Sequence, residues 1–123
     1  MIEDILSGEV KEKDVIKSVE VVDFKKAFRN PDAIPEERKE RLKDREFVLI
    51  TTEKGCMESH LIPKGLKLED GKWKVESKLE LARSIKNPAS WFRRYYNKYK
   101  KFPEEGDEIE VTINQRGFLR IDV

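Results

Sequence analysis

Cationic and aromatic side chains are concentrated in one segment of the chain, residues 83–101. This segment holds seven basic residues, no acidic residue and five aromatic rings, whereas the whole chain carries a net charge of only +1. Cations can follow a phosphate backbone, and an exposed ring can stack on an unpaired base for about 1–3 kcal/mol. Bases inside a duplex are not free to stack in this way. The segment therefore indicates contact with nucleic acid, and with single strands in particular.

Helical phase divides this segment into a core side and a candidate binding side. With about 100° between successive residues, Phe92, Tyr96 and Tyr99 form one stripe, which we expect to pack on a sheet. Trp91 and Tyr95 lie on a flank of that stripe, so we expect them to stack on bases while nearby cations contact phosphates. The nucleic-acid-binding residues predicted on this helix are Trp91, Arg93, Arg94, Tyr95, Lys98 and Lys101.

Two further rings extend the prediction beyond the helix. Trp73 lies in a predicted hairpin, and Phe118 alternates out of the core on the last predicted strand, beside Arg116 and Arg120. A ring next to a cation offers a base and its phosphate one contact each. We therefore add Trp73, Arg116 and Phe118 to the predicted nucleic-acid-binding residues.

Two other interpretations of the same residues stay open at this point. The acidic residues at 104–110 follow the helix directly, so they could fold back and neutralise it, which would leave an ion-paired, solvated surface. The flank with Trp91 and Tyr95 could instead bind a protein partner or a second copy of the chain, because Trp, Tyr and Arg are enriched at interface hot spots.

A thiol, a carboxylate and an imidazole also recur at alternate positions of a predicted strand, at Cys56, Glu58 and His60. Residues two apart on a strand lie about 6.5–7 Å apart at Cα, so Cys56 and His60 are too distant to form a nucleophilic pair. The chain has no zinc-ligand spacing and no glycine-rich phosphate loop. We therefore expect no catalytic residue, metal, cofactor or small-molecule substrate, and predict that the protein is not an enzyme.

Composition predicts one domain spanning residues 1–123, with residues 1–12 as a loose N-terminal segment. Charged residues make up 41% of the chain, and Cys56 is its only cysteine. No stretch is apolar enough for a signal peptide or a membrane span. We expect a soluble, cytoplasmic protein with no membrane partner. Abundant Lys, Glu and Arg with little Gln, Met or Cys also indicate a heat-adapted source.

Hydrophobic spacing predicts an α+β fold, in which an antiparallel sheet of about four strands carries helices packed on one face. Residues 14–29 fit a helical period and are predicted as a helix, although the β-branched residues at 19–22 are also typical of a strand. Asn87 and Pro88 are expected either to kink the preceding helix or to cap the aromatic helix, which we expect to run from there to Lys101. The remaining expected elements are helices at 35–44 and 78–86, strands at 46–52 and 56–62, and hairpins at 66–75 and 108–123.

The segment Asn87-Pro88-Ala89-Ser90-Trp91-Phe92-Arg93-Arg94-Tyr95-Tyr96, in a small Lys/Glu-rich chain, resembles the ThermoDBP single-stranded DNA-binding proteins of thermophilic archaea. The resemblance is one of type: a compact helix-and-sheet domain with an aromatic cleft flanked by basic residues. It carries over no individual binding residue. It implies an archaeal single-stranded DNA-binding protein. The founding type ends in a leucine-zipper helix, whereas this chain ends in a predicted strand, so the resemblance implies a relative that oligomerises through another surface.

Taken together, these residues favour a non-catalytic protein that binds single-stranded DNA or RNA with little sequence specificity. The alternative is a protein–protein interaction module or assembly subunit that uses the same flank as its interface. The sequence does not separate DNA from RNA, and it leaves the oligomeric state open.

Overall fold

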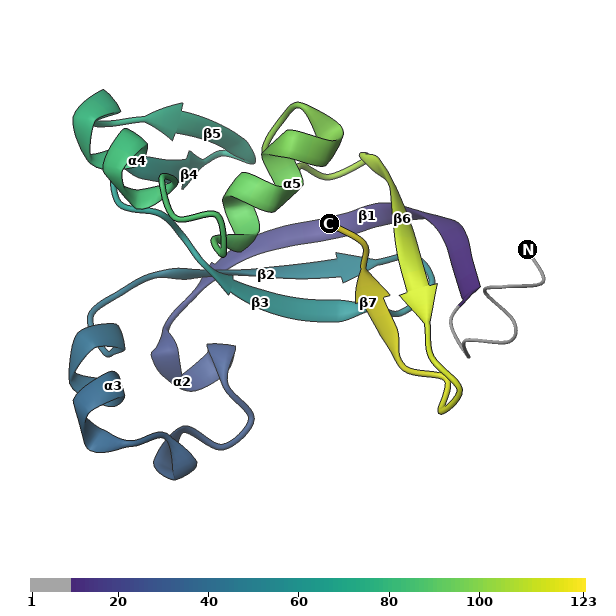
Figure 1. The fold of residues 1–123 in the computed structure, drawn as a ribbon, viewed down its shortest axis with the longest axis horizontal. Helices are drawn as coiled ribbons and strands as arrows, with labels where there is room; N and C mark the ends of the chain where they lie inside the picture. The colour runs from purple at the N-terminus through teal and green to yellow at the C-terminus, as the bar shows by residue number, and fades with distance from the viewer. Residues whose placement is uncertain (1–9) are drawn as a thin grey trace.

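The computed structural model describes residues 10–123. The predicted loose segment at 1–12 therefore falls largely outside the described residues. The strands are β1 (Val10–Val22), β2 (Phe47–Thr52), β3 (Met57–Leu61), β4 (Leu66–Glu69), β5 (Lys72–Val75), β6 (Glu108–Ile113) and β7 (Leu119–Ile121) (Figure 1). The helices are α2 (Phe24–Ala27), the short 3₁₀ helix η1 (Pro31–Ala33), α3 (Glu36–Leu42), α4 (Lys78–Ser84) and α5 (Trp91–Tyr99). None of the helices described over residues 10–123 is long and apolar enough to cross a membrane.

β1 organises a five-stranded antiparallel sheet whose order is β3-β2-β1-β6-β7. Its first half pairs with β6 and its second half with β2, and the pairing register shifts between Ile16 and Ser18. Three strands that form a meander, with a fourth that returns beside the first, make a Greek key. β1, β2, β3 and β6 follow this pattern (Figure 1).

The sheet curls until its two edge strands, β3 and β7, lie together. Their seam is bridged through side chains: the Ile121 backbone N–H donates to Glu58 Oε2 at 2.5 Å, and the Cys56 thiol lies 3.6 Å from the Leu119 carbonyl oxygen. The sheet is therefore a nearly closed barrel. The predicted α+β fold with antiparallel strands is confirmed, but the main sheet has five strands rather than four, and the helices do not share one face.

α5 closes one end of this barrel. Phe92 and Tyr95 are fully buried in a single core with Val48, Ile50 and Val111 from the strands. Aromatic side chains bury a large apolar area, and a buried tyrosine needs a partner for its hydroxyl. The Tyr95 hydroxyl donates to Asp107 Oδ2 at 3.1 Å. Phe92 and Tyr95, two of the aromatic residues of the basic segment, thus fill this end of the barrel.

A second, smaller core lies outside the barrel, under the connection between β1 and β2. Its buried residues are Val22, Phe24 and Phe47. The Asp23 side chain caps α2 by accepting from the Lys26 backbone N–H. In Figure 1 this connection, with α2 and α3, forms a lobe below the sheet. The predicted helix at 35–44 is confirmed as α3.

The predicted helix at 14–29 is wrong, because residues up to Val22 belong to β1 and only Phe24–Ala27 are helical. The register shift between Ile16 and Ser18 interrupts the alternation of a regular strand, so the inward residues imitate a longer period. The predicted start of the aromatic helix is also wrong. α5 begins at Trp91, while the Asn87 side chain accepts from the Ala89 backbone N–H in a turn before it.

The link between β3 and β4 packs tightly against the start of α4. Gly65 has a φ of +85°, and a Cβ there would lie 2.4 Å from the Ser77 carbonyl oxygen. Only glycine allows this approach. It fixes the neighbouring Lys64, whose carbonyl oxygen accepts a hydrogen bond from the Ser84 hydroxyl at 3.4 Å.

Candidate nucleic-acid interface

The burial of α5 differs from the predicted phase. Tyr95 is 0% exposed, and burial raises the pKa of its hydroxyl, with Asp107 adding to the effect. Tyr96, predicted for the core, is 46% exposed. The core stripe is therefore Phe92, Tyr95 and Tyr99, turned by part of a helical turn toward Trp91. The prediction that Tyr95 stacks on bases is wrong, because its ring is enclosed in the barrel end.

Acidic residues neutralise part of the basic helix. The Lys101 ammonium lies 2.7 Å from Asp107, and Lys98 pairs with Glu110 at 3.1 Å and with Asp122. Carboxylates from the 104–110 segment do therefore fold back onto two of the predicted phosphate contacts. These two cations are tied to the barrel, which makes them weaker candidates for binding phosphate.

The two arginines of α5 differ in their roles. The half-buried Arg93 donates from Nη1 to the carbonyl oxygens of Ile85 and Lys86, at 3.1 and 2.8 Å, and so caps the C-terminal end of α4. Arg94 is exposed, and no ion pair within residues 10–123 involves it. Arg93 has a structural task, while Arg94 stays accessible to solvent.

Trp91 lies against the only histidine of the chain. The Trp91 and His60 rings are stacked, with centroids 3.9 Å apart and planes 8° from parallel. His60 covers one face of the indole, and the rest of Trp91 is half-buried at the wall of a cavity. Trp91 is the one aromatic residue of α5 that was predicted to bind nucleic acid and that also lines the cavity.

Trp73 is held within the fold rather than presented to a ligand. Its indole N–H donates to the Pro103 carbonyl oxygen at 2.7 Å, and its ring meets Phe92 edge-on at 5.2 Å. These contacts attach the β4–β5 hairpin to the outside of α5. Little of the Trp73 ring is therefore exposed for the base stacking that was predicted.

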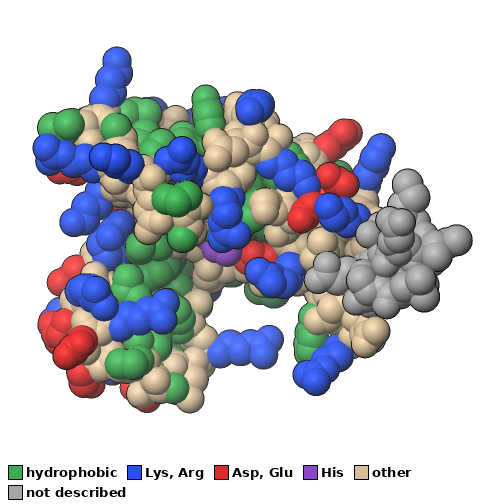
Figure 2. Space-filling view, viewed as in Figure 1, with side chains coloured by type: hydrophobic (Ala, Val, Ile, Leu, Met, Phe, Trp, Pro, Cys, Tyr) green, Lys and Arg blue, Asp and Glu red, His purple; other side chains and the backbone are tan. Residues whose placement is uncertain are grey.

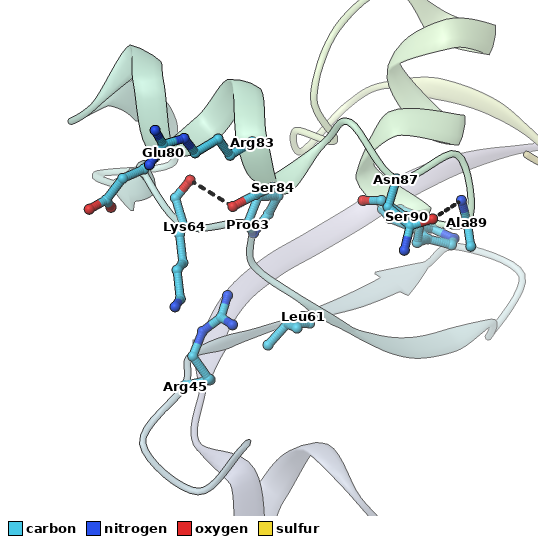
Figure 3. Close-up of a pocket in the computed structure, with 11 residues that line it drawn as sticks. Arg45, Leu61, Pro63, Lys64, Glu80, Arg83, Ser84, Asn87, Ala89 and Ser90 are labelled. Atoms are coloured by element: carbon cyan, nitrogen blue, oxygen red, sulfur yellow. Dashed lines mark hydrogen bonds between the residues drawn. The ribbon is translucent and has the colours of Figure 1, made fainter. Parts of the chain in front are cut away.

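A cavity of about 730 Å³ lies between the end of β3 with the link that follows it, α4 and the start of α5, with Arg45 from the link between α3 and β2 (Figure 3). Three cationic side chains line it, against one carboxylate, Glu80. The full lining consists of Arg45, Leu61, Pro63, Lys64, Glu80, Arg83, Ser84, Asn87, Ala89, Ser90 and Trp91. Its size falls within the range of about 300–1,000 Å³ that is typical of ligand sites.

The outward side of β3 and β7, with the turn that precedes β7, forms a surface that we call the β3 face, made of Met57, Ser59, Arg116, Phe118 and Arg120. Met57 and Phe118 are each 64% exposed, and both arginines are exposed. The Asn114 side chain accepts from the backbone N–H groups of Arg116 and Phe118, at 2.9 and 3.0 Å, so the turn that carries them is fixed. The predicted residues Arg116 and Phe118 therefore lie on a preformed, open surface.

Leu61 connects the β3 face to the cavity, because it ends β3 on the outward side and also lines the cavity. In Figure 2 the histidine (purple) lies near the middle of this side of the molecule. Lys and Arg side chains (blue) lie around it, an acidic side chain (red) lies directly beside it, and further Asp and Glu side chains lie toward the upper right and lower left of the view. The β3 face and the cavity are thus adjacent, with Leu61 common to both.

The thiol, carboxylate and imidazole of β3 form a structural network. Burial raises the pKa of Cys56 to about 12, and the charge of Glu58, 3.5 Å from its sulfur, adds to this. A thiol that is protonated at neutral pH is a poor nucleophile. Glu58 Oε1 lies 2.7 Å from His60 Nε2. No group of three His, Cys, Asp or Glu side chains within residues 10–123 is arranged to hold a metal ion.

Glu58→Gln should lower the free energy of unfolding by about 1.5–3 kcal/mol near neutral pH, the usual contribution of hydrogen bonds to a charged group. Burial alone would raise the pKa of Glu58, but the bonds to His60 and to the Ile121 N–H outweigh it and lower the pKa. A carboxylate with a lowered folded pKa stabilises the protein above its ordinary pKa, and this stabilisation is lost as the pH falls through the folded value. Denaturant unfolding at several pH values measures the difference between the two proteins. A difference that does not shrink in acid would contradict this role.

Comparisons with protein-family models, with curated proteins and with solved structures found no match. The assignment of function therefore depends on the geometry of the site. Sequence reasoning missed Arg45 and Lys64, which lie outside the basic segment, and it missed the stacking of His60 on Trp91. Only the fold brings these residues together, and no spacing in the sequence signals it.

Proposed function

We propose that this protein binds single-stranded nucleic acid, without catalysis and with little sequence preference, across the β3 face and the adjoining cavity. One observation carries the proposal, namely that two groups of cations lie next to each other. The exposed Phe118 lies beside Arg116 and Arg120 on the β3 face. Leu61 joins this face to the cavity that is lined by Arg45, Lys64 and Arg83. Five basic side chains and one exposed aromatic ring along this surface are complementary to a flexible strand with phosphates and unpaired bases.

The architecture supports the same class of ligand by analogy. OB-folds are five-stranded, partly open Greek-key barrels that bind oligonucleotides and oligosaccharides on their second and third strands and on the loops after strands one and four. Here the barrel also has five strands in a Greek-key order. The β3 face lies on the third barrel strand and includes the turn after the fourth, β6. A likeness of architecture alone does not assign function, so the residues of the face carry the argument.

The side chains of the β3 face favour single strands and general rather than sequence-specific contacts. Arginine heads can pair with phosphates of any sequence, and a ring such as Phe118 can stack on any unpaired base. The free, buried Cys56 also agrees with a reducing compartment such as the cytoplasm.

Fluorescence anisotropy with a labelled strand of about 20 nucleotides and the matching duplex tests this proposal. If the strand engages about three to five of these cations, log K should fall against log salt with a slope of about −2 to −3.5. The single strand should bind more tightly than the duplex. Equal binding of both forms would contradict stacking. Absence of binding at low salt would overturn the proposal and favour an interaction module instead.

A further inference from the structure

The cavity differs from the β3 face in chemistry, and this difference points to a more specific ligand. On the β3 face the cations are spread along the surface, whereas in the cavity they line one partly open volume. We propose that the cavity anchors the terminal phosphate of the bound strand. This inference rests on the proposed function, because it concerns where the end of the same strand binds.

Arg45 and Lys64 come from different parts of the fold and point into the same space. Arg45 lies between α3 and β2, and Lys64 lies in the link between β3 and β4. Figure 3 shows the Lys64 side chain extending toward the Arg45 guanidinium, with Leu61 beside them. The Arg45 Nη2 donates to the Ile62 carbonyl oxygen at 2.8 Å, which orients the rest of the guanidinium toward the cavity.

No carboxylate within residues 10–123 forms an ion pair with Arg45, Lys64 or Arg83, although ion pairs hold many other lysines of the chain. The carboxylate of Glu80, the one acidic residue of the lining, points away from Arg45 in Figure 3. Burial lowers the pKa of Arg45, which shows that its charge is partly desolvated without an acidic partner. Two converging cations of this kind favour an anion between them.

The number of charges distinguishes an end of the strand from its interior. An internal phosphodiester carries one negative charge, whereas a phosphate monoester carries about −1.5 to −2 near neutral pH. The converging Arg45 and Lys64 match the monoester. With Arg83 also in the lining, the cavity has more positive charge than one internal linkage needs.

The opposite wall of the cavity can receive the rest of a terminal nucleotide. Ser90 is the N-cap residue of α5 but makes no side-chain cap bond, and the first turn of α5 contains no acidic residue. The backbone N–H groups of this first turn, at the positive end of the helix dipole, therefore favour negative charge on that side. Asn87 adds an amide to this wall, and the Trp91 indole, whose face is stacked on His60, adds apolar surface beside it. The volume of about 730 Å³ accommodates one nucleotide.

Three strands of one sequence test the inference, with a 5′-phosphate, a 3′-phosphate or hydroxyls at both ends. One phosphorylated strand should bind at least about tenfold more tightly than the hydroxyl strand, since each strong charge-assisted contact contributes on that scale. Equal affinity of all three would overturn the inference and leave the proposed function standing. No binding by any strand would overturn both. A free nucleoside monophosphate that binds as tightly as the phosphorylated strand would show a nucleotide site, and would contradict strand-end recognition.

Lys64→Ala separates the cavity from general electrostatics, because Lys64 is exposed and its removal should not unfold the protein. The affinity of the phosphorylated strand should fall by about fivefold or more relative to that of the hydroxyl strand, because the hydroxyl strand meets Lys64 only as one of several spread cations. Lys25→Ala is the matched control, since Lys25 is exposed and lies outside the cavity lining. Equal losses for both strands in Lys64→Ala would overturn the inference.

Discussion

Tyr95→Ala should destabilise the protein by about 3–5 kcal/mol, the usual cost of removing a buried aromatic ring. The Tyr95 ring is fully enclosed at the barrel end, where it packs between Trp91 and Tyr99 at centroid distances of 5.2 and 4.6 Å. Denaturant unfolding followed by circular dichroism measures the loss.

The adjacent Tyr96 provides the matched control, because it is the same residue type on the same helix but 46% exposed. Tyr96→Ala removes a ring contact with Phe102 at 5.3 Å and should cost only about 0.5–1.5 kcal/mol. Tyr95→Phe removes only the hydroxyl bond to Asp107 and should cost about 0.5–1.5 kcal/mol. If the Tyr95→Ala protein were as stable as the Tyr96→Ala protein, packing of the Tyr95 ring would not stabilise the end of the barrel.

Phe118→Ala should weaken single-strand binding by about 5- to 150-fold, which corresponds to the loss of one base-stacking contact. The ring is 64% exposed, and the Asn114 side chain fixes the turn that presents it. A ring held in place before binding loses little entropy when a base stacks on it. Anisotropy titration of the variant and the original protein with the same strand gives the ratio.

Tyr96→Ala serves again as the control, because it removes an exposed ring outside both the β3 face and the cavity at the start of α5. Its affinity for the strand should match that of the original protein. The Phe118 variant should also unfold at the same denaturant concentration as the original. Unchanged affinity in Phe118→Ala would remove the aromatic part of the proposed interface.

Much of the local structure could be predicted because it follows from local signals. The buried run at Phe47–Thr52, the Asp70-Gly71 turn of the second hairpin and the alternation at Glu108–Ile113 all give the expected strands. β1 could not be predicted in the same way. It bends around the barrel and is bulged near Ile16, so its burial pattern depends on two different partner strands.

The phase of α5 shows why the candidate site was only partly predictable. Five rings in nine residues cover a wide arc of the helix, so the sequence fits more than one choice of buried side. Which side is buried depends on how the helix packs into the open end of the barrel, where Tyr95 is buried and Tyr96 is not. Barrel closure itself depends on the contact between Glu58 and Ile121, which are far apart in sequence.

The cavity was beyond sequence reasoning for a similar reason. Arg45, Lys64 and Arg83 come from three separate segments, and each alone is an ordinary basic residue near a turn or a helix end. By contrast, Arg116 and Phe118 were predicted, because strand alternation and a short turn determine their exposure locally. Local patterns thus predicted the exposed residues at one end of the proposed interface, whereas only the tertiary structure brings the residues at the other end together.

Amide chemical-shift mapping with a single-stranded oligonucleotide tests most directly whether the β3 face and the cavity bind the strand. The largest shifts should fall on residues 57–64, 83–91 and 116–120, with smaller changes on the ion-paired Lys98 and Lys101. Shifts centred on residues 94–101, with the β3 face unchanged, would contradict this location of the interface. A spectrum that does not change at low salt would contradict nucleic-acid binding altogether.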